Sequence, residues 1–181
     1  MSDELEILGL VTGRLEGAGI QYMLSGSMAL NHYAQPRMTR DMDLVVNLRG
    51  PDAAGIVELF EEDFGADLEE VKAAIANRRM FNLIHVERVI KVDMVVRKDT
   101  PYRVDEFSRR RRVDYAGLSL WIVTAEDLLL SKLDWARASH SDFQLRDVRN
   151  LIAAVPDLDW QHIDRWAKEL GVVELLAEVR S

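Results

Sequence analysis

Two aspartates, Asp41 and Asp43, are the residues of this sequence whose type and spacing most suggest chemistry. They fall at the start of an alternating apolar segment, 42–46, which predicts a β-strand with both carboxylates on one face. Two carboxylates held this close repel each other unless a cation lies between them, and a divalent cation with oxygen ligands is the usual partner. Taken alone, the pair would be interpreted as solvated residues at a strand edge, so the flanking motifs decide whether it is a metal site.

A Gly-Ser turn, Gly26-Ser27, lies upstream of the aspartates. It follows a predicted strand at 20–24 and precedes a short predicted helix at 28–34. Backbone N–H groups at the start of a helix, together with a hydroxyl, are suited to phosphate oxygens. A basic loop, 37–40, joins this helix to the aspartate strand. We therefore expect a phosphate-binding turn beside the metal site.

A third carboxylate, Asp93, lies in the strongest strand signal of the chain, 89–96. A carboxylate is unexpected in the middle of a run of β-branched residues. Lys91 and Asp93 share one face of this strand, and the preceding strand at 80–86 is predicted to pair with it as a hairpin. Three acidic residues with compatible placements, downstream of a Gly-Ser turn, favour a metal site over solvated aspartates.

These motifs resemble the nucleotidyltransferase superfamily of the polymerase-beta type, and within it the AbiEii-type and MenT-type toxin branch. The superfamily signature is an apolar strand, Gly-Ser, Asp-x-Asp, and a third carboxylate on a later strand. The residues that carry the likeness are Gly26-Ser27, Arg37-Met38-Thr39-Arg40-Asp41-Met42-Asp43, Lys91-Val92-Asp93, Thr124 to Leu133, and Arg146-Asp147-Val148. They occur in the expected order across most of residues 20–155, which is far more specific than Asp-x-Asp alone.

The resemblance implies a catalytic site with two metal ions. Asp41 and Asp43 would hold two Mg²⁺ ions, for which Mn²⁺ is a substitute, against the triphosphate of an NTP such as ATP. Asp93 would hold the second ion and help to deprotonate the acceptor hydroxyl. The expected reaction is transfer of a nucleoside monophosphate to a hydroxyl group, with release of pyrophosphate.

The resemblance also implies a set of nucleotide-binding residues. Gly26 would let the backbone approach the phosphates, because a Cβ atom would obstruct it, and Ser27 would bond a β- or γ-phosphate oxygen. Lys132, a fourth catalytic residue, would reach the triphosphate as a point charge, while Arg37 and Arg40 could neutralise phosphate or clamp the aspartate loop. The implied nucleotide-binding residues are Gly26, Ser27, Arg37, Arg40, Lys132 and Asp147, although Arg146-Asp147 could equally be a structural ion pair.

The expected fold class is α/β (α+β), with a small mixed sheet of about four or five strands flanked by helices. The pattern changes from mixed α/β before residue 124 to all-helical after it. We therefore expect a nucleotidyltransferase core at 1–123 and a helical C-terminal subdomain at 124–181 packed on it. A short basic helix is predicted at 105–112. Its run Arg109–Arg112 is either a solvated helix face or a contact for RNA phosphates.

Bulk composition narrows the function classes. The 181 residues include 23 basic and 31 acidic ones, so the net charge is −8 and nucleic acid would need a local basic patch. Cysteine is absent, which excludes disulfides, thiolate zinc sites and a cysteine nucleophile. No signal peptide or membrane-spanning stretch is indicated, so we expect a cytoplasmic protein without a membrane partner.

The sequence leaves three functions open. The resemblance favours the toxin of a toxin–antitoxin pair, acting on tRNA 3′ ends or on protein hydroxyls, with a cognate antitoxin as a further partner. An aminoglycoside-type small-molecule nucleotidyltransferase is the first alternative, because an acidic surface suits a polycationic substrate. A non-catalytic nucleotide- or partner-binding protein of the same fold is the second, although such a protein has no need to hold three repelling carboxylates together.

Overall fold

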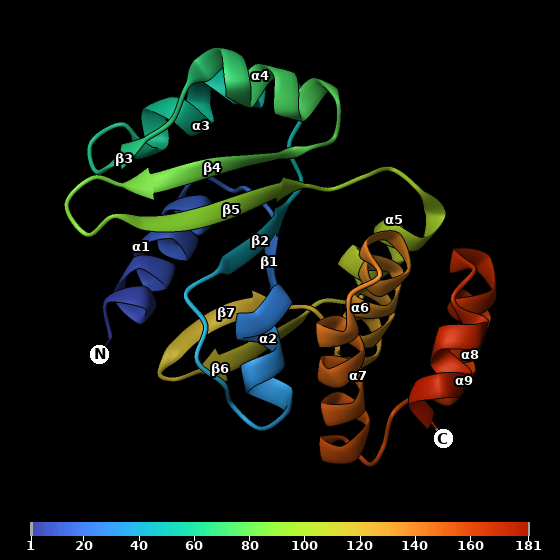
Figure 1. Ribbon diagram of the computed structural model, residues 1–181. Coiled ribbons are helices and arrows are strands. Elements are labelled where there is room, and N and C mark those ends of the chain that lie inside the picture. Colours follow the sequence, from blue (N-terminus) through green and yellow to red (C-terminus); the bar gives the residue numbers. More distant parts are fainter. Residues whose placement is uncertain (1, 181) are drawn as a thin grey trace.

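The computed structural model describes residues 2–180, which form one mixed β-sheet with helices on both faces (Figure 1). Within these residues the sheet has seven strands in the order β3-β4-β5-β2-β1-β7-β6. The strands are β1 Tyr22–Ser25, β2 Met42–Val46, β3 Phe64–Gly65, β4 Met80–His85, β5 Ile90–Val96, β6 Arg111–Tyr115 and β7 Leu118–Ile122. The helices are α1 Asp3–Gly17, α2 Gly26–Tyr33, α3 Asp52–Phe60, α4 Leu68–Ala76, α5 Pro101–Ser108, α6 Ala125–Ser139, α7 Asp142–Ala154, α8 Trp160–Leu170 and α9 Val173–Arg180.

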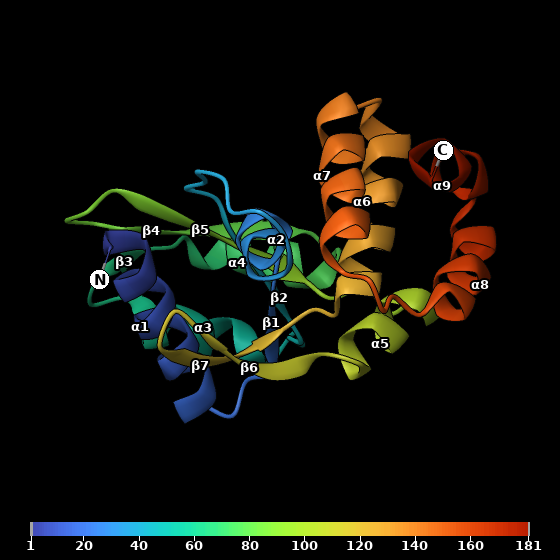
Figure 2. The same ribbon diagram turned by 90° about the horizontal axis from the view of Figure 1, so that it is seen from below.

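Strand β2 lies in the middle of the sheet. Its side chains alternate between the hydrophobic core and the face that carries the predicted site. It pairs antiparallel with β1 and parallel with β5. Met42, Leu44 and Val46 are fully buried, whereas Asp43 points to the opposite face, as the period of a strand requires. Helices α1 and α3 lie on one side of the β1–β2 pair, and α2 and α7 lie on the other (Figure 2). The expected strand at 42–46 is confirmed.

The Gly-Ser pair sits differently from the prediction. Strand β1 ends at Ser25, and α2 begins at Gly26 rather than after Ser27. Gly26 has a φ of 62°, a left-handed conformation that glycine adopts without a steric penalty. The chain can therefore pass from strand to helix within one residue, so Gly26 and Ser27 form the first turn of α2.

The sheet is larger than the predicted four or five strands, and the basic helix predicted at 105–112 is wrong in its second half. Helix α5 ends at Ser108, and the residues that follow form β6, paired antiparallel with β7. The turn between these strands, Ala116-Gly117, has positive φ at both residues. This conformation matches the twist of a two-residue hairpin. It lets Arg111–Tyr115 fold back and pair with β7 as a strand.

Helices α6 to α9 form the C-terminal part, as predicted, and α6 and α7 pack against α2. Thr124 caps α6 by accepting a hydrogen bond from the Asp127 backbone. The division into 1–123 and 124–181 stays a prediction, and its first and last residues lie outside the described chain. No helix within residues 2–180 is long and apolar enough to cross a membrane.

Candidate active site

Four polar side chains form a row across the front face of the sheet. Asp43 on β2 is paired in register with Ser25 on β1 and with Asp93 on β5, and Asp93 is paired with Asn82 on β4. Residues paired in register point to the same face of a sheet. The row therefore places the carboxylates of Asp43 and Asp93 on neighbouring strands, with Asp41 exposed just before β2.

Burial and like charge act together on Asp43. Burial and, after it, the neighbouring carboxylates of Asp93 and Asp41 raise the pKa of its carboxyl group to about 6, although Lys132 and Lys91 oppose the rise. A carboxyl group with this pKa is half-protonated at about pH 6. A divalent cation beside it would relieve the same repulsion without a proton.

Gly26 lies directly against the carboxylate of Asp43. A Cβ atom placed on Gly26 would lie 1.9 Å from Oδ2 and 2.7 Å from Cγ of that aspartate. Only a residue without a side chain fits here. The first turn of α2, with its free N–H groups, is thus brought directly against the carboxylate row.

Asp93 is held by its neighbour Lys91. Nζ of Lys91 lies 2.9 Å from Oδ1 and 3.0 Å from Oδ2 of Asp93, and it donates its hydrogen bond to Oδ2. Oδ1 is buried and accepts no hydrogen bond from residues 2–180. Among those residues, no three acidic or histidine side chains already converge into a complete metal site. The raised pKa of Asp43 and the carboxylate of Asp93, whose partner Lys91 is 46% exposed, nevertheless fit a divalent cation, which would replace the lysine as partner of that carboxylate.

A second cluster connects Ser27 to the C-terminal helices. Arg37 donates hydrogen bonds to Oγ of Ser27, at 2.6 Å, and to both carboxylate oxygens of Asp147, at 3.1 and 3.3 Å. Nζ of Lys132 lies 2.8 Å from the same carboxylate and 3.2 Å from the amide oxygen of Gln144. Asp147 therefore holds two cations beside the first turn of α2.

The loop before β2 is held in place at Arg37. Asn31 accepts a hydrogen bond from the Arg37 backbone N–H at 3.0 Å and donates one to its carbonyl oxygen at 2.8 Å. The guanidinium group lies 4.4 Å from the centre of the Phe143 ring, within the range of a cation–π contact. The hydrogen bonds between Asn31 and the Arg37 backbone, together with the contact with the Phe143 ring, thus hold the guanidinium group beside Ser27.

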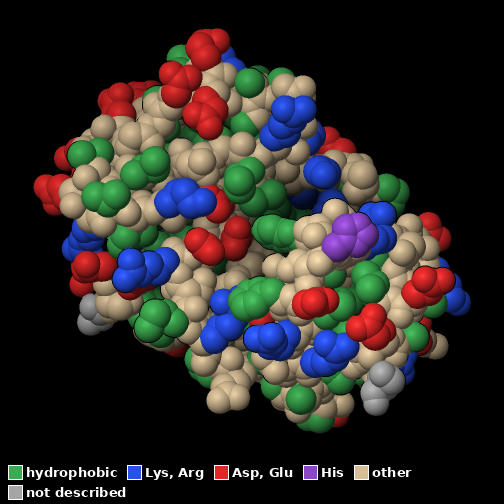
Figure 3. Space-filling view, in the orientation of Figure 1, with side chains coloured by type: hydrophobic (Ala, Val, Ile, Leu, Met, Phe, Trp, Pro, Cys, Tyr) green, Lys and Arg blue, Asp and Glu red, His purple; other side chains and the backbone are tan. Residues whose placement is uncertain are grey.

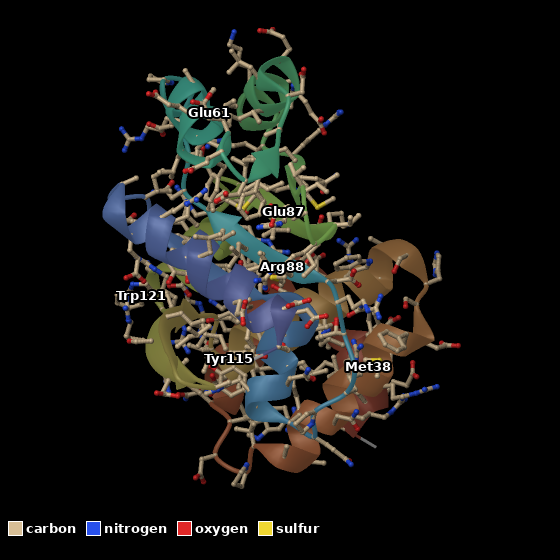
Figure 4. The ribbon with its side chains drawn as sticks, turned by 90° about the vertical axis from the view of Figure 1, so that its left-hand side faces the viewer. Met38, Glu61, Glu87, Arg88, Tyr115 and Trp121 are labelled. Carbon is tan, nitrogen blue, oxygen red and sulfur yellow. The ribbon has the colours of Figure 1, made fainter. Side chains whose placement is uncertain are left out.

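The remaining predicted residue, Arg40, lies at the border of the site. Arg40 is exposed and, with Arg37, lines a hollow of about 620 Å³ between α1, α2 and the loop. Met38 lies on this loop on one side of α2, and Tyr115 lies on the other side (Figure 4). Acidic side chains gather around a depression in the middle of the front face, and basic side chains lie along its lower border (Figure 3).

The basic run Arg109–Arg112 is not a helix face and does not join this site. Arg109 pairs with Asp127 of α6, Arg110 lies over the rings of Phe107 and Trp121, and Arg112 pairs with Glu16 of α1. Three of the four side chains are engaged within the protein, and the alternative role of the run as a contact for RNA phosphates stays a prediction.

Comparison with solved structures identifies the architecture. An antigenic nucleotidyltransferase-like protein from Paracoccidioides brasiliensis superposes with a TM-score of 0.60 at 16% identity, over 98% of this chain and 92% of the other. The chain has a nucleotidyltransferase-like fold. ANT(2″)-Ia in complex with adenylyl-2″-tobramycin gives 0.59 at 12% identity, over 94% and 97%. The lincosamide antibiotic adenylyltransferase LnuA, bound to lincomycin, gives 0.53 at 15% identity, over 86% and 98%.

At this level of identity the nucleotidyltransferase-like structures establish the fold alone. No protein-family model and no curated protein matches the sequence. The fold expected from the motifs is confirmed, whereas the comparisons give no support for the AbiEii-type and MenT-type branch.

Sequence reasoning found the carboxylates and the cations but missed the amides around them. Asn31 clamps Arg37, Gln144 contacts Lys132, and Asn82 lies beside Asp93. A signal existed only for Asn82, because a polar residue between Phe81 and Leu83 points to the face opposite the core in a strand of period two. The other two depend on contacts between elements that local patterns do not specify.

Proposed function

We propose that this protein is a metal-dependent nucleotidyltransferase that moves a nucleoside monophosphate from an NTP to a hydroxyl group. The observation that carries the proposal is the close approach of Gly26 to Asp43, with Asp93 paired in register on the next strand. This arrangement puts the start of a helix, which suits phosphate, against two carboxylates, which suit a divalent cation.

In the proposed reaction, the oxygen of the acceptor attacks the α-phosphorus of the NTP. The bond from that phosphorus to the oxygen bridging the α- and β-phosphorus breaks, and pyrophosphate leaves. Asp93 would accept the proton of the acceptor hydroxyl at its carboxylate, and Asp41, Asp43 and Asp93 would hold the Mg²⁺ or Mn²⁺ ions. Bound at these carboxylates, the ions would neutralise charge on the phosphates.

The triphosphate would lie over the first turn of α2. Ser27 would donate its hydroxyl hydrogen to a phosphate oxygen, and Arg37 and Lys132, which share the carboxylate of Asp147, would supply positive charge. Because Asp147 is buried with Lys132, it would act as a positioning residue that orients both cations rather than as a group that touches the nucleotide. Arg40, exposed at the border, would meet the outermost phosphate.

Two versions of this function differ in the acceptor of the nucleoside monophosphate. The sequence resemblance favours a toxin that modifies tRNA 3′ ends or protein hydroxyls, with a cognate antitoxin. The fold likeness supports a second candidate, a nucleotidyltransferase that acts on a small molecule. Two of the similar structures contain adenylyl-2″-tobramycin and lincomycin, and they superpose over 94% and 86% of this chain. The net charge of −8 favours a polycationic small molecule over a polyanion.

One experiment separates these candidates. The purified protein is incubated with Mg²⁺ and each α-labelled NTP, together with total tRNA, lysate protein, tobramycin or lincomycin. Label on one acceptor, lost in Asp43→Asn and Asp93→Asn, supports the enzyme and names its substrate class. Metal-dependent NTP binding without any transfer would identify the non-catalytic binding protein, and absence of both would contradict the proposal.

A further inference from the structure

The carboxylate row continues for one strand beyond Asp93. Asn82 on β4 is the Cα partner of Asp93 in the antiparallel β4–β5 hairpin, whose strands lie side by side in Figure 1. Partners in register on one face have Cβ atoms only about 5 Å apart. The amide of Asn82 therefore faces the same space as the carboxylate of Asp93, on the side away from Asp43.

Asn82 carries a buried oxygen that lacks a hydrogen-bond donor, and Oδ1 of Asp93 lies 2.9 Å from the ammonium group of Lys91 without forming a hydrogen bond. Within the described chain, Oδ1 of Asn82 and Oδ1 of Asp93 are buried and accept no hydrogen bond. Buried acceptors without a partner are rare in folded proteins because they have lost their water. A buried amide oxygen without a donor, beside a carboxylate whose counter-charge is the half-exposed Lys91, indicates that a cation from outside the polypeptide belongs between them.

The neighbours of this pair supply no donor for the amide oxygen of Asn82. Lys91 contacts both carboxylate oxygens of Asp93, and the residues that flank Asn82 on the same face of β4 are the apolar Met80 and Ile84. A carboxylate oxygen and an amide oxygen are a ligand set that Mg²⁺ and Mn²⁺ prefer. A divalent cation satisfies both oxygens at once.

We propose that Asn82 is a metal ligand, and that its side-chain oxygen and Oδ1 of Asp93 together bind one divalent cation of the Mg²⁺ and Mn²⁺ class. The inference rests on the proposed function, because that function requires a cation at Asp93. It adds a neutral ligand to the three aspartates, which holds the ion without adding a further negative charge to a site that already repels itself.

The absence of cysteine from the sequence provides a direct test. Asn82→Cys introduces the protein's single thiol at the proposed ligand position, and thiolates prefer Cd²⁺ over Mg²⁺ and Mn²⁺. If residue 82 is a ligand, Cd²⁺ added to this variant produces a thiolate–Cd²⁺ charge-transfer absorption at one ion per chain. The absorption is lost when Asp93→Ala is added.

Ile84→Cys is the matched control. Ile84 lies on the same strand and face, paired with Lys91, and is exposed. Its thiol should give no absorption at the Cd²⁺ concentration that saturates Asn82→Cys. Asn82→Ala should in addition weaken Mn²⁺ binding about tenfold, the low end of the loss seen when a group that supports a metal site is removed.

The outcomes separate this inference from the proposed function. Equal Cd²⁺ signals from the two cysteine variants, or a signal from Asn82→Cys that persists without Asp93, would overturn the ligand role of Asn82. Unchanged Mn²⁺ affinity in Asn82→Ala, with loss of binding in Asp93→Asn, would overturn the inference and leave the metal-dependent enzyme intact. Unchanged binding in Asp43→Asn and Asp93→Asn would remove the metal site itself.

Discussion

Gly26 and Asp43 leave no room for a side chain between them, since a Cβ atom on the glycine would lie 1.9 Å from Oδ2 of the aspartate. The glycine belongs to the first turn of α2 and the aspartate to the central strand β2. This single contact joins the proposed phosphate-binding turn to the proposed metal site.

Replacing this glycine tests the contact. Gly26→Ala should destabilise the protein through its left-handed φ of 62°, which costs about 1–2 kcal/mol for alanine, and through the clash with Asp43. Gly19→Ala is the matched control, because Gly19 has a φ of 69° but open space around its Cβ position. Urea unfolding should show a larger loss of stability for Gly26→Ala, and Mn²⁺ titration should show weaker binding only there. Equal losses in the two variants would mean that the contact with Asp43 is unimportant.

Asp147 should be the most sensitive of the ion-pair residues. The side chains of Asp147 and Lys132 are 2% and 5% exposed, so Asp147→Asn leaves a buried ammonium group without its counter-charge. We expect a loss of about 3 kcal/mol in the free energy of unfolding. Asp164→Asn, which breaks an exposed pair with Arg180, should cost under about 1 kcal/mol. Similar small effects of both changes would argue against a buried charge at Lys132.

The stability of the metal-free protein should depend on pH through Asp43. Its carboxyl pKa rises from 3.8 to about 6 on folding, so the native state binds this proton more tightly than the unfolded state. The resulting stabilisation is complete below about pH 4 and is lost as the pH rises through 6. At about 1.4 kcal/mol for each pH unit between the two pKa values, the loss is about 3 kcal/mol.

Urea unfolding at several pH values measures this dependence. The difference between wild type and Asp43→Asn isolates the aspartate from the other titrating groups. Saturating Mg²⁺ should flatten the wild-type curve, because a bound cation favours the ionised carboxylate. A wild-type curve parallel to that of Asp43→Asn would show that the carboxyl pKa is not raised.

Lys91 should compete with metal ions for Asp93. Its ammonium group contacts both carboxylate oxygens and is 46% exposed, so the pair is worth no more than about 1 kcal/mol. Lys91→Met should therefore raise Mn²⁺ affinity by up to roughly fivefold, as measured by electron paramagnetic resonance of the free ion. Lys72→Met, at an exposed pair on α4, should have no effect. Weaker Mn²⁺ binding in Lys91→Met would reverse this interpretation of the lysine.

The parts of the site that lie within one element were predictable from the sequence, and the parts that join elements were not. The alternation around Asp43 and Asp93 placed both strands, because a strand's faces follow from its own residues. The hairpin formed by β6 and β7 was only partly found, since four consecutive arginines obscured the alternation of Arg111–Tyr115. The contacts of Asn31 with Arg37 and of Gln144 with Lys132 depend on how a loop and two helices pack, which no local pattern specifies.

Transfer of label from defined positions of the NTP tests the central claim most directly. With Mg²⁺ and the acceptor found by screening, the account predicts that label in the α-phosphate moves to the acceptor and that label in the γ-phosphate appears in pyrophosphate. Both should vanish in Asp43→Asn and Asp93→Asn. Movement of the γ-label to the acceptor, or transfer of the α-label that survives both substitutions, would contradict nucleotidyl transfer at this site.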